Sequence, residues 1–156
     1  MKQGGFLRGF GYAASGIAAA VREERNLRFH LVTGCFVLYF SHFYAFTRAE
    51  RLILVVLIAG VIALELVNSA IERAVDKPDP EHDMAAGAAK DMAAGAVLAF
   101  SIGAAVCGAV LFWDLPTLRG ILAYFLGAWY RIPVLAAALV GGYLFVFCYR
   151  KRGSGE

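Results

Sequence analysis

Long apolar stretches separated by short polar segments dominate the pattern of the chain. A bilayer core about 30 Å thick requires roughly 20 mostly apolar residues of helix. Stretches of about this length predict four transmembrane helices, over residues 31–46, 52–75, 92–113 and 132–149. The third is uncharged throughout, whereas the second is apolar as far as Leu64 and then carries Glu65 and Glu72. The pattern therefore predicts an all-α, polytopic membrane helical bundle.

Two further segments have the pattern of helices that lie on the membrane surface. Residues 6–28 alternate apolar residues with arginines at helical spacing, which predicts an amphipathic helix with a break near Gly11 or Gly16. Residues 115–130 are apolar but contain Arg119 and several aromatic residues, which predicts a helix at the membrane interface.

Short joints and small residues indicate how the spans pack. The joint Thr47–Arg51 is so short that the first two spans are expected to form a tight antiparallel hairpin. The sequence MAAGA occurs at 84–88 and again at 92–96. Small residues at that density let membrane helices approach each other closely, so we expect this repeat to lie in a helix contact.

The composition agrees with a membrane protein and excludes other classes. The 156 residues are 60% apolar and 17% charged, with a mean hydropathy of +0.65, whereas average chains carry about 25% charged residues. Cys35, Cys107 and Cys148 lie in apolar stretches without metal-site spacing, which indicates small buried side chains rather than disulfides. We divide the chain into a membrane core, residues 1–113, and a C-terminal extension, residues 114–156, that holds the fourth span.

Lysine and arginine counts predict the orientation. Five precede the first span and three follow the last, whereas two lie in each of the segments 47–51 and 114–131. Because basic residues favour the cytoplasmic side, four spans would place both termini in the cytoplasm. The acidic segment 76–91 would then face the cytoplasm, where ATP is present.

Four polar residues share one face of the second span. Glu65, Asn68, Glu72 and Asp76 are separated by three or four positions, which aligns them along a helix. A carboxylate at the bilayer centre costs about 2.5–3.5 kcal/mol, so these acids require a cation, a proton or a partner. One interpretation is that they pair with Arg28, Arg73 or Lys90 to hold the bundle together. The other is a Mg²⁺ site with a general base, since Mg²⁺ binds carboxylate and phosphate oxygens together.

Two other polar segments lie at the same predicted membrane surface. EERNLRFH, residues 23–30, precedes the first span, and Lys90-Asp91 precedes the third. Lysine binds phosphate as a point charge. The three elements together predict phosphoryl transfer from a nucleotide, although the sequence has no P-loop motif and no kinase-type glycine loop.

The runs ELVNSAIERAVD (65–76), AKDMAAGAV (89–97) and EERNLRFH resemble the small prokaryotic integral-membrane diacylglycerol kinases and undecaprenol kinases. The resemblance covers residues 6–113. It implies a homotrimer with three membrane helices and a surface helix per subunit, in the bacterial inner membrane. It also implies transfer of the γ-phosphate of MgATP to a lipid hydroxyl at the cytoplasmic face, which yields phosphatidic acid from diacylglycerol or undecaprenyl phosphate from undecaprenol.

The same resemblance implies a role for each residue of the site. Glu65 would be the general base that takes the proton of the lipid hydroxyl, and Asn68 would orient the base or the phosphate. Glu24 and Glu72 would hold the Mg²⁺ ion that accompanies ATP. The further residues implied to contact the nucleotide are Tyr12, Asp76, Glu81, Lys90 and Asp91.

The acceptor lipid and the class of protein have alternatives. EERNLRFH is more similar to the undecaprenol-type branch, but diacylglycerol remains an alternative acceptor. A small proton- or cation-coupled transporter is the alternative class, because intramembrane glutamates also serve such coupling. The polar groups gather on one side of the membrane, which argues against a transport path. No nucleic-acid partner is expected, and removal of residues 132–156 is expected to leave the kinase active.

Overall fold

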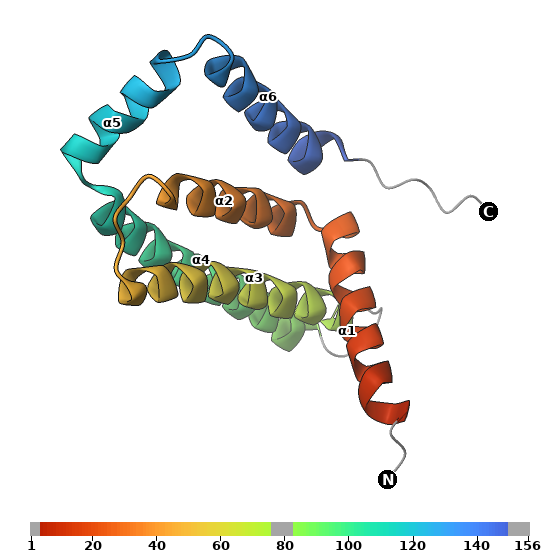
Figure 1. The fold of residues 1–156 in the computed structure, drawn as a ribbon. Helices are drawn as coiled ribbons and strands as arrows, with labels where there is room; N and C mark the ends of the chain where they lie inside the picture. The colour runs from red at the N-terminus through yellow and green to blue at the C-terminus, as the bar shows by residue number, and fades with distance from the viewer. Residues whose placement is uncertain (1–3, 76–82, 150–156) are drawn as a thin grey trace.

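The computed structural model describes residues 4–75 and 83–149, and every regular element in these ranges is helical (Figure 1). The all-α prediction is therefore confirmed. Six α-helices are followed by a short π-helix: α1 (Gly4–Glu23), α2 (Arg25–Ser41), α3 (Arg48–Val75), α4 (Asp83–Phe112), α5 (Leu115–Leu126), α6 (Arg131–Tyr143) and η1 (Leu144–Cys148).

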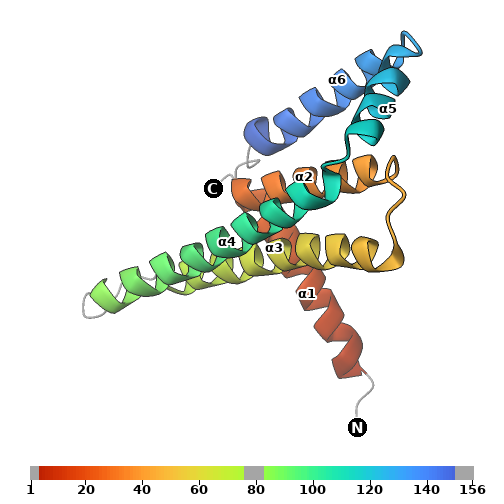
Figure 2. The same ribbon diagram turned by 90° about the vertical axis from the view of Figure 1, so that its left-hand side faces the viewer.

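The helices form a layered bundle around α2. The long helices α3 and α4 lie side by side and antiparallel, and α2 packs against α3 (Figures 1 and 2). The C-terminal segment α6–η1 covers the opposite side of α2, with η1 in direct contact with it. Helix α1 leaves the start of α2 at a steep angle. The extension therefore packs on the core through α2.

Three described helices are long and apolar enough to cross a membrane. They are α3, residues 85–112 of α4, and the continuous segment Arg131–Cys148, with mean hydropathies of 2.5, 2.2 and 1.9. Three of the four predicted spans are thus confirmed as candidates. The predicted span over residues 31–46 falls in α2, which begins at Arg25 and has 17 residues, about 25 Å of helix. It is not among the three candidates, so this fourth span stays a prediction.

The break between the surface helix and α2 falls at Glu24, and the predicted break near Gly11 or Gly16 is wrong. Both glycines lie inside α1, and no atom lies within 4 Å of a Cβ placed on either, so no packing bends the helix there. At Glu24 the backbone is extended, with φ −96° and ψ 113°. The Arg28 guanidinium donates to the last carbonyls of α1 at 3.0 and 3.1 Å, which satisfies groups that a helix end leaves without partners.

The hairpin between α2 and α3 turns earlier than predicted. Residues 42–47 form the turn, and α3 begins at Arg48 rather than near residue 52. A capping box explains this start. The Thr47 N–H donates to Glu50 Oε2 at 2.7 Å, and the Glu50 N–H donates to Thr47 Oγ1 at 3.3 Å.

Glycines make close helix contacts, but not those of the MAAGA repeat. A Cβ on Gly60 would lie 2.5 Å from Phe100 Cζ, and one on Gly34 would lie 2.9 Å from Ile58 Cγ2. No atom lies within 4 Å of the equivalent position on Gly87 or Gly95. Within one chain the glycines of the repeat therefore make no close contact, and α3 approaches its neighbours at other glycines.

Large apolar side chains remain exposed on the outer faces of the single chain. Met92, Val106 and Val110 of α4 are 76%, 59% and 73% exposed. The three cysteines are also exposed in the single chain, which corrects the prediction that they are buried. Exposed apolar faces of this kind are typical of surfaces in contact with lipid or with another subunit.

The end of the bundle that holds α5 is rich in aromatic side chains. The predicted interfacial segment is helical as far as Leu126, and Asp114 caps it by accepting a hydrogen bond from the Thr117 N–H at 2.9 Å. Hydrogen bonds with the Thr117 side chain and with its backbone N–H lower the pKa of the Asp114 carboxyl. Trp129 is 87% exposed beside Tyr130, as expected of aromatic residues at a membrane interface.

Candidate active site

Glu65 lies buried at the level where α3 meets the junction of α1 and α2. Only 3% of its surface is exposed. The Asn26 side chain and the carboxylates of Glu24 and Glu72 interact electrostatically with it. Ser69 Oγ donates to the Glu65 backbone carbonyl at 2.9 Å. The deepest acid of the predicted polar face is therefore surrounded by polar groups from two helices and their junction.

Asn68 and Glu72 are directly linked on the same face of α3. Asn68 Nδ2 donates to Glu72 Oε1 at 2.8 Å, and Asn68 is 7% exposed. Its Oδ1 atom is buried and has no hydrogen-bond partner among the residues that the structure describes. A buried acceptor without a partner is costly, and it is an atom that a bound ligand can satisfy.

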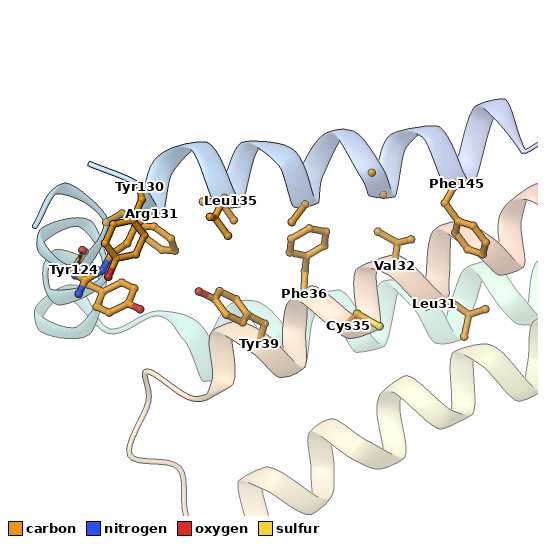
Figure 3. Close-up of a pocket in the computed structure, with 15 residues that line it drawn as sticks. Leu31, Val32, Cys35, Phe36, Tyr39, Tyr124, Tyr130, Arg131, Leu135 and Phe145 are labelled. Carbon is orange, nitrogen blue, oxygen red and sulfur yellow. Dashed lines mark hydrogen bonds between the residues drawn. The ribbon is translucent and has the colours of Figure 1, made fainter. Parts of the chain in front are cut away.

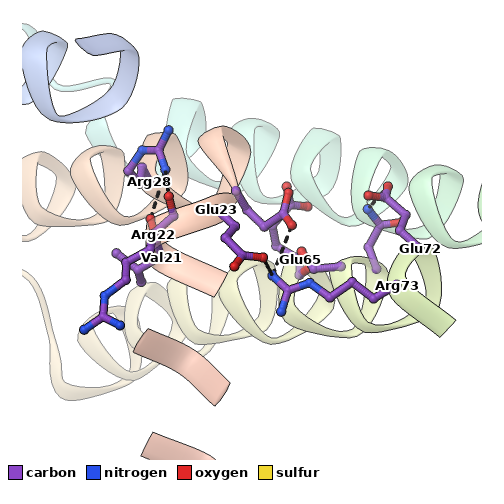
Figure 4. A network of polar contacts seen from close by, with 10 residues as sticks. Val21, Arg22, Glu23, Arg28, Glu65, Glu72 and Arg73 are labelled. Carbon is purple, nitrogen blue, oxygen red and sulfur yellow. Dashed lines mark hydrogen bonds and ion pairs between the residues drawn. The ribbon is translucent and has the colours of Figure 1, made fainter. Parts of the chain in front are cut away.

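Glu24 forms an ion pair with Arg73, as the alternative interpretation of the acids expects (Figure 4). Arg73 Nη2 lies 3.2 Å from Glu23 Oε2 and 3.2 Å from Glu24 Oε1. Neither Glu65 nor Glu72 forms an ion pair within residues 4–75 and 83–149. Pairing with arginine thus accounts for one of the predicted metal-binding acids. It leaves Glu65 and Glu72 without an ion-pair partner among the described residues.

The carboxylates suit Mg²⁺ only if a substrate supplies further oxygens. No cluster of three or more His, Cys, Asp or Glu side chains gathers among the described residues. Mg²⁺ is usually held by one or two carboxylates together with phosphate oxygens and water. Glu72 and the unpartnered Asn68 oxygen fit that set, and Glu24 fits it once its contact with Arg73 opens.

Lys90 and Asp91 lie at the same level of the bundle as Asn68. Helices α3 and α4 are antiparallel neighbours, and Lys90 is as far from the start of α4 as Asn68 is from the end of α3 (Figure 2). Lys90 is half-buried and Asp91 is exposed. The fold therefore brings the lysine to the depth of the acidic face.

The other predicted nucleotide contacts are not brought to this site by any described interaction. Tyr12 is 75% exposed on α1, and its side chain has no hydrogen bond or ring contact within the described part of the chain. Asp76 and Glu81 lie outside the described residues.

Two polar residues that sequence reasoning left without a role contribute here, and Arg28, weighed as a partner of the acids, binds backbone carbonyls at the neighbouring junction instead. Asn26 and Ser69 both contact Glu65 and lie within the motifs EERNLRFH and ELVNSAIERAVD, so their position in the motifs was the available signal. Arg28 is 6% exposed and donates from Nε and Nη2 to the Val146 carbonyl at 3.4 and 3.2 Å. No sequence pattern connects it with a carbonyl 118 residues later.

Comparison with known proteins decides between the two classes. A family model described as prokaryotic diacylglycerol kinase matches residues 11–112. The chain belongs to this family. It is 40% identical over 107 residues to an undecaprenol kinase of Bacillus subtilis, which covers 69% of this chain and 87% of that protein. It is 31% identical over 102 residues to a diacylglycerol kinase of Haemophilus influenzae, which covers 65% of this chain and 86% of that protein.

The protein is therefore a lipid kinase of this family, and the resemblance inferred from its motifs is confirmed. The transporter alternative loses its support, since both relatives are named as kinases. The matched region contains Glu65, Asn68 and the rest of the polar face of α3. Helices α5 and α6 lie beyond the matched region.

Proposed function

We propose that this kinase transfers the γ-phosphate of ATP to the hydroxyl of a membrane lipid in a Mg²⁺-dependent reaction. The observation that carries the proposal is the buried carboxylate of Glu65, which has no ion pair among the described residues and lies beside the linked pair Asn68–Glu72. A buried acid of this kind needs a proton, a cation or a substrate to satisfy it. A lipid hydroxyl at the end of the membrane helices supplies such a group.

Glu65 acts as the general base. It takes the proton of the lipid hydroxyl while that oxygen forms a bond to the γ-phosphorus and the bond to the β-phosphate oxygen breaks, which releases ADP. Positioning and charge neutralisation account for most of the catalysis of phosphoryl transfer. Asn26 and Ser69, which contact Glu65, keep its side chain and backbone in place.

Glu72 and Glu24 would hold Mg²⁺, with the Asn68 Oδ1 atom as a further acceptor. When bound, the ion would supply the positive charge that neutralises the phosphates. Lys90 and Asp91 contact the phosphates from α4, and Tyr12, Asp76 and Glu81 contact the rest of the nucleotide. Glu24 leaves Arg73 when the nucleotide binds, and Arg73 is then available for a phosphate.

Undecaprenol is the acceptor that the comparisons favour over diacylglycerol. The identity to the undecaprenol kinase is 40%, against 31% to the diacylglycerol kinase. The reaction would then produce undecaprenyl phosphate. Phosphatidic acid is the product of the alternative acceptor.

The working unit is a homotrimer in the bacterial inner membrane with its site at the cytoplasmic face. The exposed apolar face of α4, with Met92, Val106 and Val110, gives a surface for subunit contact. Basic residues before the first span and after the last span support the orientation.

The test is ATP-dependent incorporation of labelled phosphate into lipid by the purified protein in mixed micelles. Undecaprenol and diacylglycerol are offered separately and together, with and without Mg²⁺. We expect labelling to depend on Mg²⁺ and undecaprenol to have the higher kcat/KM. Diacylglycerol is labelled more weakly or not at all. Equal labelling without Mg²⁺, or transfer to neither lipid by folded protein, would contradict the proposal.

A further inference from the structure

A cavity of about 740 Å³ lies between α2 and the helices of the C-terminal extension (Figure 3). Its walls are apolar side chains of α2 and α6, among them Val32, Phe36 and Leu135. At Gly142 helix α6 approaches α2 so closely that a Cβ would lie 2.9 Å from Val32 Cγ1. The size is within the range of about 300–1,000 Å³ that is usual for small-molecule sites.

One charged residue lines this cavity, and it lies at the end beside the turn between α5 and α6. Arg131 Nη1 donates to the Tyr124 carbonyl at 2.6 Å, and its guanidinium carbon lies 3.9 Å from the centre of the Tyr124 ring. Its Nε atom is buried and has no hydrogen-bond partner within the described ranges. No carboxylate lines the cavity, and Arg131 forms no ion pair in the described part of the chain.

A cation beside an apolar cavity requires an anion to neutralise it. Arginine binds phosphate through two parallel hydrogen bonds, and such charge-assisted bonds are stronger than neutral ones. The molecule that joins a phosphate to an apolar chain, and that surrounds membrane helices, is a phospholipid. The apolar walls of the cavity and the arginine at its end therefore match one ligand.

We propose that the groove between α2 and α6 binds an anionic phospholipid, with one acyl chain along the two helices and the phosphate at Arg131. This site is separate from the acids around Glu65. Glu65 of α3 lies beside the start of α2. Tyr39, near the other end of α2, lines the groove beside Arg131 (Figure 3). One wall comes from helices beyond the region that matches the family. The proposal does not depend on which lipid the kinase phosphorylates.

Native mass spectrometry of the full chain tests this proposal. The protein is released from detergent after equilibration with phosphatidylglycerol or phosphatidylethanolamine of identical acyl chains. We expect phosphatidylglycerol to be retained in preference, and Arg131→Gln to lower its apparent affinity about tenfold, the effect of one lost charge-assisted contact. The matched control is Arg119→Gln, an exposed arginine of α5 outside the cavity, which should bind as the wild type does.

A second pair of variants blocks the apolar part of the groove and leaves Arg131 intact. Ala138 lines the cavity and Ala136 lies on the other side of α6, so Ala138→Trp should lower phosphatidylglycerol binding and Ala136→Trp should not. This pair decides the matter if Arg131→Gln does not fold. Equal binding of the two lipids, or equal binding by both tryptophan variants, would overturn the proposal. The proposal would also be overturned if the wild-type protein bound no lipid and Ala138→Trp alone dissociated the oligomer. A second copy of the chain would then occupy the groove.

Discussion

Two regions of the molecule each bury an ionisable side chain, but only one of them surrounds it with a full set of hydrogen-bond partners. At the junction of α1, α2 and η1, Arg28 is 6% exposed and its guanidinium donates to carbonyl oxygens of Val21, Arg22 and Val146. On α3, Glu65 is 3% exposed and has no ion pair within the described residues. A buried charge with a full set of partners stabilises the fold, whereas one without a counter-ion is available for a ligand.

The comparison predicts that the α3 face can be changed with a large loss of activity and little loss of stability. Glu65→Gln keeps the shape of the side chain and removes its basicity, so we expect phosphate transfer to lipid to fall by about 10²–10⁴-fold. The thermal unfolding midpoint in detergent should stay close to that of the wild type.

Glu50→Gln is the matched control for this change. Glu50 lies in the first turn of the same helix, where glutamine also supports a capping box. It should retain wild-type transfer. Near-wild-type turnover of Glu65→Gln would show that Glu65 is not the base.

The second prediction concerns the acid that is linked to Asn68. Glu72→Gln keeps a hydrogen-bond acceptor for the Asn68 amide but removes a negative charge. We expect the Mg²⁺ concentration for half-maximal activity to rise roughly tenfold, since charge count sets the affinity of oxygen sites for divalent ions. Titration of activity with Mg²⁺ at saturating lipid measures this. An unchanged Mg²⁺ response would remove Glu72 from the metal site.

The Arg28 junction should give the opposite result. Arg28→Gln removes hydrogen bonds from a charged, buried donor, each worth about 1.5–3 kcal/mol. We expect the unfolding midpoint to fall by on the order of 5 °C. Turnover per folded molecule should change little, because Arg28 contacts backbone carbonyls and none of the acids of α3.

Arg22→Gln is the control for this loss of stability, because the Arg22 side chain is exposed and the change keeps the backbone carbonyl that accepts from Arg28. The sequence-based expectation that removal of residues 132–156 leaves the kinase active stays a prediction. The truncated chain should nevertheless be less stable, since Arg28 would lose the Val146 carbonyl. A truncated protein as stable as the full chain would show that this contact contributes nothing.

The smallest effect is expected where the two regions meet. Arg73 bridges Glu23 and Glu24 with side chains that are 29–43% exposed, and exposed ion pairs are worth about 0–1 kcal/mol. Arg73→Gln should therefore hardly change the unfolding midpoint, while Arg48→Gln serves as an exposed control on the same helix. If Glu24 binds Mg²⁺, its release from Arg73 should lower the required Mg²⁺ concentration by roughly twofold. A higher requirement would mean that Arg73 itself holds the phosphates.

Much of the polar face could be derived from sequence because it depends on one helix. The spacing of Glu65, Asn68 and Glu72 fixes a common face by helix geometry alone, and the structure shows in addition a direct hydrogen bond from Asn68 to Glu72. The metal-binding role of Glu24 could not be settled this way, because its partner Arg73 lies 49 residues later on another helix. The contact of Asn26 with Glu65 likewise depends on the packing of α2 against α3.

The sequence by itself determined that this is a helical membrane protein of the kinase family, since hydropathy, helical periodicity and short motifs are local properties of the chain. Tertiary structure decided where α1 ends, which glycines bring helices together, and where the extension packs. Those features depend on contacts between distant residues, such as Arg28 with the Val146 carbonyl and Gly60 with Phe100. A linear pattern records which groups share a helix face, but only packing decides which of them are buried and which satisfy one another.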